Sequence, residues 1–209
     1  MRILKICKVS RIFFVTIFIL STHYGFSQGI SAEYDCTLSY PSGVSLKYSG
    51  KYYYQDNRSI SYLIPEYLIQ YPDGNVERNG TSYVFSTDSI QYILLVNLDS
   101  GKYESYIYPR FYKGKFGVFN GEWQLTTEIL EISGYKCQHA YWVSSNGKDT
   151  LSEIWFTADI PSPTGFEVWT PVPGLVIKLK NKMGLEATLR KVRIGDTISP
   201  EVFIRKELE

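Results

Sequence analysis

Short runs rich in Tyr, Val, Ile and Thr, separated by turn residues, recur along the chain from residue 31 to residue 194. Such β-branched and aromatic residues are typical of strands, and no long stretch repeats its apolar residues with a helical period. We therefore expect a mainly β, antiparallel protein with little helix. The expected strands are 31–40, 46–55, 58–64, 82–87, 90–98, 102–108, 115–119, 122–132, 135–144, 149–157, 174–181 and 184–194.

Three Asn-Gly pairs punctuate these runs, at residues 79–80, 120–121 and 146–147. An Asn-Gly pair suits a two-residue type I′ turn, because both positions of that turn need a positive φ. A turn at 146–147 fixes the register of a hairpin, whose side chains alternate between two faces. The predicted core-face pairs are Val143 with Thr150, Tyr141 with Ser152, His139 with Ile154, and Cys137 with Phe156.

Residues 1–28 have the order of a secretory signal peptide: a basic start, the apolar run Ile12–Leu20, and then a polar stretch. As a helix, the nine apolar residues would span roughly 14 Å, well short of the ~30 Å hydrocarbon core of a membrane. We therefore expect cleavage after Gln28 and no stable transmembrane anchor afterwards. The predicted domain is a single β-rich unit over residues 29–209, exported to the periplasm, the outer envelope or the medium.

Residues 29–209 contain two cysteines, Cys36 and Cys137. An exported protein meets an oxidising compartment, where this pair could form a disulfide. The bridge would close a loop of about 100 residues and contribute about 4.7 kcal/mol in the chain-entropy model. Because the sequence does not show whether the Cα atoms lie within ~7 Å, a disulfide and two free thiols both stay open.

Charge and motifs argue against several function classes. The chain has 22 Lys and Arg against 21 Asp and Glu, which gives no support for a nucleic-acid binder. It lacks a phosphate-binding Gly-rich loop, a His-Glu-x-x-His motif and a Gly-x-Ser-x-Gly elbow. One histidine, His139, remains after residue 28, too few for a His-rich zinc site. We therefore expect no cofactor, no metal and no enzymatic activity.

Two enzymatic alternatives remain. Cys137 and His139 lie two residues apart on a predicted strand and so face the same way, which would allow a thiolate pair. The simpler interpretation is two half-buried groups on an apolar hairpin face. Glu153, Asp159 and Glu167 could supply a carboxyl pair of the glycosidase type, but linear spacing does not set their separation. The simpler interpretation of these acids is solvated charge.

The segment 159–174 differs from the rest, because four prolines exclude it from the interior of a sheet. It is apolar for a loop, and a long apolar loop packs over a sheet or binds something. We therefore take this loop as the candidate binding site. Its candidate residues are Phe166, Trp169, Pro173, Gly174 and Leu175, although a structural corner at Pro173-Gly174-Leu175 explains that triplet more simply.

Four segments occur in a recognisable order. They are Gly121-Glu122-Trp123-Gln124-Leu125, the run from Ile132 to Ala140, the run from Glu153 to Pro161, and Pro171-Val172-Pro173-Gly174-Leu175-Val176. Together they resemble the GLPGLI family of exported proteins from Bacteroidetes-type bacteria, over about the last half of residues 29–209. In the naming motif, Pro173, Gly174 and Leu175 match literally. Leu130 replaces a lysine that is frequent in the family shortly before the Ile-x-Gly-Tyr segment.

The resemblance implies export and an uncharacterised role, and it transfers no catalytic residue. It also implies a likeness to lipoprotein carriers, in which a single curved antiparallel sheet forms a half-barrel or open barrel around an apolar ligand. Fold analogy does not establish function. We therefore expect a non-enzymatic binding or carrier module for an apolar small molecule, a lipid or an envelope protein. A structural component of the envelope acting through a sheet edge, and an enzyme using Cys137 and His139, are the alternatives.

Overall fold

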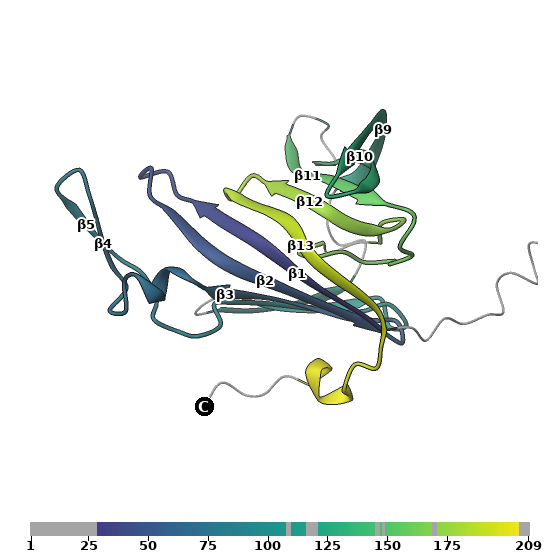
Figure 1. The fold of residues 1–209 in the computed structure, drawn as a ribbon, viewed down its shortest axis with the longest axis horizontal. Helices are drawn as coiled ribbons and strands as arrows, with labels where there is room; N and C mark the ends of the chain where they lie inside the picture. Colours follow the sequence, from purple (N-terminus) through teal and green to yellow (C-terminus); the bar gives the residue numbers. More distant parts are fainter. Residues whose placement is uncertain are drawn as a thin grey trace, which may run out of the picture.

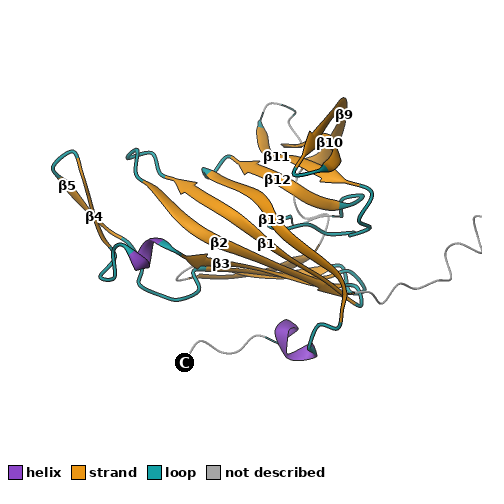
Figure 2. Cartoon of the chain, viewed as in Figure 1, coloured by secondary structure: helices purple, strands orange, loops and turns teal. Residues whose placement is uncertain are grey.

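The structure, a computed structural model, describes residues 29–107, 110–115, 121–144, 147, 149–168 and 171–204. In these residues the chain forms one eleven-stranded antiparallel sheet and a separate two-stranded hairpin, and no α-helix. Figures 1 and 2 show the large sheet curving strongly without closing into a barrel. The mainly β fold with a single curved sheet is confirmed. No helix of the described residues is long and apolar enough to cross a membrane.

The order of strands in the large sheet is β8-β7-β6-β3-β2-β1-β13-β12-β11-β10-β9, so the first and last strands pair at its centre. β4 and β5 form the separate hairpin, which projects from one side of the sheet in Figure 1. The bounds are β1 (Gly29–Ser39), β2 (Ser45–Gln55), β3 (Arg58–Pro65), β4 (Asn75–Arg78), β5 (Thr81–Val84), β6 (Tyr92–Asn97), β7 (Lys102–Ile107), β8 (Arg110–Lys115), β9 (Gly121–Ile132), β10 (Tyr135–Ser144), β11 (Thr150–Thr157), β12 (Leu175–Asn181) and β13 (Leu185–Asp196).

Two strands of the structure were not expected from the sequence. One is β8 (Arg110–Lys115), and the strand expected at 115–119 lies, beyond Lys115, outside the described residues. β4 was not expected, because its sequence Asn-Val-Glu-Arg contains one apolar residue. The turn at Asn79-Gly80 is confirmed by positive φ angles of 51° and 73°. Asn120 and Asn146 lie outside the described residues.

The predicted register of the hairpin β10–β11 is also wrong beyond its first pair. Val143 faces Thr150 as expected, but a bulge between Trp142 and Val143 shifts the rest by one residue. His139 therefore pairs with Trp155, and Ala140 pairs with Ile154. A one-residue shift changes which residues of β11 lie on the same face as a given residue of β10. The spacing of residues in the sequence does not reveal such a shift.

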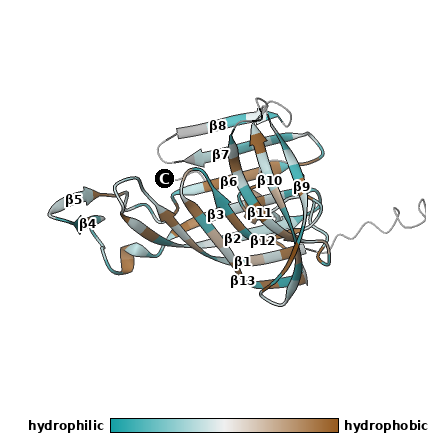
Figure 3. Cartoon of the chain, turned by 90° about the horizontal axis from the view of Figure 1, so that it is seen from above, coloured by the Kyte–Doolittle hydropathy of each residue, from teal (hydrophilic) through white to brown (hydrophobic). Residues whose placement is uncertain are grey.

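The concave face of the sheet holds the core, and the Pro-rich loop fills part of it. Alternate residues of β2 are buried there while their neighbours are more exposed. Figure 3 shows hydrophobic and hydrophilic segments following one another along the strands. Phe166 from the loop is fully buried and stacks on Tyr34 of β1, with ring centroids 4.4 Å apart. A Cβ on Gly50 would lie 2.6 Å from the Phe166 ring, so glycine is needed where the ring crosses β2.

Tyr52 fixes the same loop through its hydroxyl. The fully buried Tyr52 hydroxyl lies 2.9 Å from Ser162 Oγ and 2.8 Å from the carbonyl oxygen of Thr164. The expectation that the apolar loop packs over a sheet is therefore met by both an aromatic and a polar anchor.

Replacing Tyr52 with phenylalanine should lower the free energy of unfolding by about 1–2 kcal/mol, because the loop hydroxyls lose a buried partner. Urea unfolding of residues 29–209 measures this loss. Tyr53→Phe is the matched control, because Tyr53 lies next in the strand and on the opposite, partly exposed face. Equal stability of the two variants would contradict the anchoring role of Tyr52.

The convex face carries a smaller cluster beneath the C-terminal segment. A 3₁₀ turn, Pro200–Phe203, follows β13, and the Ser199 side chain caps it by accepting a hydrogen bond from the Glu201 N–H. Its Phe203 packs with Ile198 and with Ile60 of β3. Pro200 suits the first position of this turn, because its fixed φ is already helical and its missing N–H has no partner there.

Candidate binding site

The candidate residues of the Pro-rich loop mostly hold the loop to the sheet. Phe166 and Leu175 are fully buried, and Pro173 is exposed. Gly174 is required by close approach, because a Cβ there would lie 2.0 Å from the carbonyl oxygen of Thr157. Trp169 lies outside the described residues. A binding role for these residues stays a prediction, and their described contacts are those of a structural corner and a core anchor.

Two adjoining cavities open on the concave face beside this loop. The first, of about 340 Å³, is walled by Trp123 and Trp142 from β9 and β10, together with Leu179 of β12. The second, of about 330 Å³, lies toward the β4–β5 hairpin and is lined by aromatic and aliphatic residues, namely Leu38, Tyr40, Tyr48, Leu63, Phe85, Tyr92 and Leu185. The two cavities share three lining residues: Glu167, Asn181 and Met183.

Glu167 lies between the two cavities in an unusual backbone conformation. The Val168 N–H donates to the carbonyl of Gly165, so residues 165–168 form a tight turn. Glu167 is the third residue of that turn and has φ 57°, a position that favours glycine or asparagine. The conformation is held in place by the Glu167 N–H, which donates to Ser61 Oγ of β3.

Glu167 is buried, with 8% of the residue exposed, and this burial determines the protonation of its carboxyl. Burial raises the pKa of this carboxyl to about 8, and a hydrogen bond with Tyr92 partly opposes the rise. Its Oε1 atom has no hydrogen-bond partner among the described residues. Strained backbone and an unpaired buried acid are typical of functional sites.

The interpretation of Glu167 as a solvated loop charge is therefore wrong. The run Phe166-Glu167-Val168-Trp169 contained a usable signal, because a single acid is flanked by three apolar side chains.

The Cys137–His139 pair does not form a reactive thiolate site. Cys137 is fully buried, and burial raises the pKa of its thiol, whereas a nucleophilic cysteine needs a lowered pKa. The His139 ring faces two carboxylates instead, with Nε2 3.0 Å from Glu153 Oε1 and Nδ1 3.4 Å from Glu128 Oε2. The ring stacks on Trp155 at 4.3 Å, so His139 is a packed component of the outer face.

The possible disulfide is not formed, because Cys36 and Cys137 are both free and buried. Cys36 is on β1 and Cys137 is on β10, and β13, β12 and β11 lie between these strands in the sheet. Four strand spacings of about 4.8 Å along the sheet far exceed the ~7 Å that a bridge allows.

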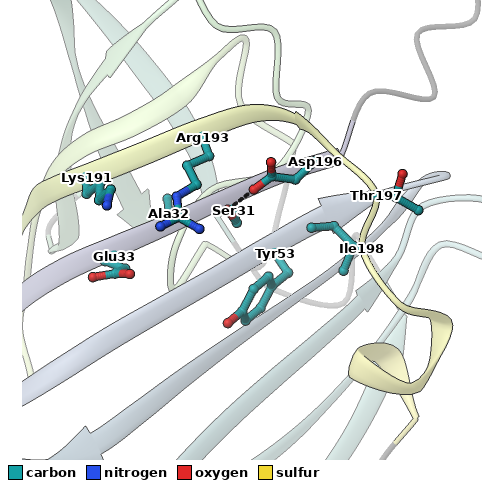
Figure 4. A pocket seen from close by; sticks show the side chains of 9 residues that line it. All are labelled: Ser31, Ala32, Glu33, Tyr53, Lys191, Arg193, Asp196, Thr197 and Ile198. Carbon is teal, nitrogen blue, oxygen red and sulfur yellow. Dashed lines mark hydrogen bonds between the residues drawn. The ribbon is translucent and has the colours of Figure 1, made fainter.

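A third concavity, of about 420 Å³, lies on the convex face near the start of β1 (Figure 4). It is polar and carries both signs of charge, with Lys191, Arg193 and Asp196 on β13 and Glu33 on β1. Asp196 already accepts a hydrogen bond from Ser31 at 3.1 Å. This balance of charge favours no class of ligand. Among the described residues, no three His, Cys, Asp or Glu side chains are grouped to hold a metal ion.

One solved structure shares this fold at low sequence identity. The structure of PNGF-II aligns with a TM-score of 0.53 and 14% identity, covering 84% of this chain. The chain spans 29% of the PNGF-II chain, so the likeness concerns the fold alone and is limited to that part of PNGF-II. No protein-family model and no curated protein matches the chain.

Two further structures align over most of both chains. An outer membrane lipoprotein-sorting protein domain from Vibrio parahaemolyticus has a TM-score of 0.34 and 9% identity, covering 91% of this chain and 94% of its own. A LolA superfamily protein from Nitrosomonas europaea has a TM-score of 0.34 and 8% identity, covering 88% and 93%.

Proposed function

We propose that this chain is a non-enzymatic binding module that holds an apolar ligand in the two cavities of its concave face. The observation that carries the proposal is the pair of adjoining, aromatic-lined cavities on either side of Glu167. Each has a volume in the range of small-molecule sites, and apolar walls with a few polar groups are typical of such sites.

The proposed location of the protein in the cell rests on the sequence. The signal-like segment 1–28 supports export to the envelope or beyond, where an apolar molecule needs a carrier to cross water. The order of motifs that resembles the GLPGLI family supports the same location. A lipid or lipid-like molecule is the class of ligand that fits an exported carrier of this shape.

Binding can be measured with N-phenyl-1-naphthylamine, a neutral apolar dye that becomes fluorescent in apolar sites. Met183 lines both cavities and is 68% exposed, so Met183→Arg should place a charge at the shared rim without disturbing the core. We expect dye affinity to fall about tenfold or more, the equivalent of ~1.4 kcal/mol. Ile194→Arg, at a position 50% exposed on β13, is the control and should bind normally.

Unchanged affinity in Met183→Arg, or no dye binding by the wild type, would contradict the cavity as the ligand site. Quenching or a blue shift of tryptophan fluorescence gives an independent readout, because Trp123 and Trp142 line the first cavity.

A second candidate, a structural component of the envelope, is favoured by the outermost strand β9. Leu125, Ile129 and Leu130 on this strand are 57%, 53% and 47% exposed. β9 pairs with β10 on one side alone among the described strands, so its other edge can accept a further strand. Sedimentation of Ile129→Lys against the wild type tests whether this edge drives assembly.

A further inference from the structure

The unpaired oxygen of Glu167 marks a polar point inside an otherwise apolar site. Glu167 is more than nine-tenths buried and lines both cavities, and its Oε1 atom has no hydrogen-bond partner among the described residues. A buried polar atom without a partner is costly, and a bound ligand can remove that cost by supplying a donor. The site therefore calls for a ligand with a hydrogen-bond donor at this point.

The charges around Glu167 indicate which donor fits best. Among the described lining residues Lys182 is the single cation, and its Nζ lies 3.4 Å from Asp149 Oδ1 at the surface. No basic side chain of the described residues pairs with Glu167. An acid without a cation is complementary to a cationic ligand.

The walls of the two cavities favour a cation as well. Trp123 and Trp142 stand on one side of Glu167, and Tyr48 and Tyr92 stand on the other. The faces of aromatic rings attract cations, and the attraction is strongest for tryptophan. A carboxylate combined with aromatic walls is therefore a receptor for an ammonium group.

We propose that Glu167 receives the ammonium head group of a cationic amphiphile, whose apolar chain lies in the adjoining cavities. This inference rests on the proposed function and names the chemical class of its ligand. The ammonium N–H groups donate to the carboxylate, and the carboxyl proton leaves to solvent when the cation binds.

Proton release makes the binding depend on pH. With a carboxyl pKa of about 8, roughly 1% of Glu167 is ionised at pH 6 and roughly 10% at pH 7. The other titratable groups that face it are Tyr92 from β6, Cys36 from β1, Tyr48 from β2 and Lys182 after β12. Burial raises the pKa values of Tyr92, Cys36 and Tyr48, so these groups stay neutral across this range.

Displacement of the neutral dye by three ten-carbon probes tests the proposal. The probes are decylammonium, which stays charged below about pH 10, neutral decanol, and anionic decyl sulfate. We expect decylammonium affinity to rise about tenfold from pH 6 to pH 7 and to level off above pH 8. Decanol affinity should not change with pH, and decyl sulfate should bind most weakly at pH 8.

Variants separate Glu167 from the rest of the site. Glu167→Gln should abolish the pH dependence and the preference for decylammonium while decanol binding is kept. Tyr92→Phe removes a hydrogen bond that lowers the pKa of Glu167, so its pH profile should move to higher pH. Glu77→Gln, on the exposed β4, is the control and should behave as wild type.

Failure of the inference can be told from failure of the proposed function. Equal affinities for decylammonium and decanol at every pH would overturn the ammonium site while leaving the apolar cavity in place. A decylammonium preference that survives in Glu167→Gln would also overturn it. Failure of all three probes and of the dye to bind would overturn both proposals.

Discussion

Replacing Phe166 with alanine should lower the free energy of unfolding by about 3–5 kcal/mol, as for other buried phenylalanines. The ring is fully buried, stacks on Tyr34, and fills the space that Gly50 leaves over β2. The backbone of the loop is tied down by Tyr52 nearby, so the loop cannot collapse freely into the space that the ring vacates. The loss therefore includes both the transfer free energy and the cost of a cavity.

Thermal unfolding checks this result, since each kcal/mol moves the midpoint by roughly 2–4 °C in a chain of this size. The midpoint of Phe166→Ala should fall by about 6–20 °C. Tyr112→Ala removes an aromatic ring at a position that is 44% exposed and should shift the midpoint little. A loss below 1 kcal/mol in Phe166→Ala would mean that the loop does not seal the concave face as described.

The position of the Phe166 ring on Tyr34 also explains why the concave face has two cavities. The Pro-rich loop crosses the middle of the face, where Phe166 and Tyr52 anchor it. The cavities are left on the two sides of the Gly165–Val168 turn, with Glu167 at its tip. The Pro-rich loop therefore determines the shape of the site and also contributes to the stability of the sheet.

The strand pattern was predictable because it rests on local properties. Tyr, Val, Ile and Thr favour strands wherever they recur, and the positive φ of Asn79-Gly80 follows from residue type. The pairing of β1 with β13 at the centre of the sheet joins the first and last strands, and no local pattern encodes such a contact. The predicted register of β10 with β11 was also wrong, because a bulge beside Trp142 shifts the pairing by one residue and residue spacing cannot reveal it.

The sequence predicted that the loop 159–174 belongs to the candidate site, but it did not predict the role of Glu167 within that loop. Prolines and apolar side chains marked 159–174 as a segment that packs on the sheet, and Phe166 does so. Glu167 is an exception to the rule that charged residues face water. Its burial depends on the Gly165–Val168 turn and on Ser61 from a distant strand. Only the folded chain brings those groups together.

The buried acid should make the stability of the domain depend on pH. Glu167 has a pKa of about 8 in the folded state against 4.5 as its ordinary value. The unfolded chain therefore releases its proton first, while the folded chain keeps it. The favourable contribution is complete below about pH 4.5 and is lost progressively as the pH rises to about 8.

Comparison with Glu167→Gln isolates this group, because every other titratable group is common to both proteins. The variant should be similar to the wild type near pH 5 and more stable by a few kcal/mol at pH 8, since one pH unit in this window changes the difference by at most ~1.4 kcal/mol. Urea unfolding at pH 5, 6, 7, 8 and 9 gives the two curves, which should become parallel again above pH 8. Curves that stay parallel throughout would show that the carboxyl titrates alike in the folded and unfolded chains.

The same measurement with decylammonium present joins stability to binding. A cation that pairs with the ionised carboxyl should stabilise the wild type most at pH 8, where Glu167 alone destabilises the fold. It should stabilise Glu167→Gln less, although the variant is the more stable protein without ligand. An acid that costs stability in the empty site and recovers it when a cation binds is what a receptor residue requires. Equal stabilisation of both proteins by decylammonium would assign the gain to the apolar walls instead.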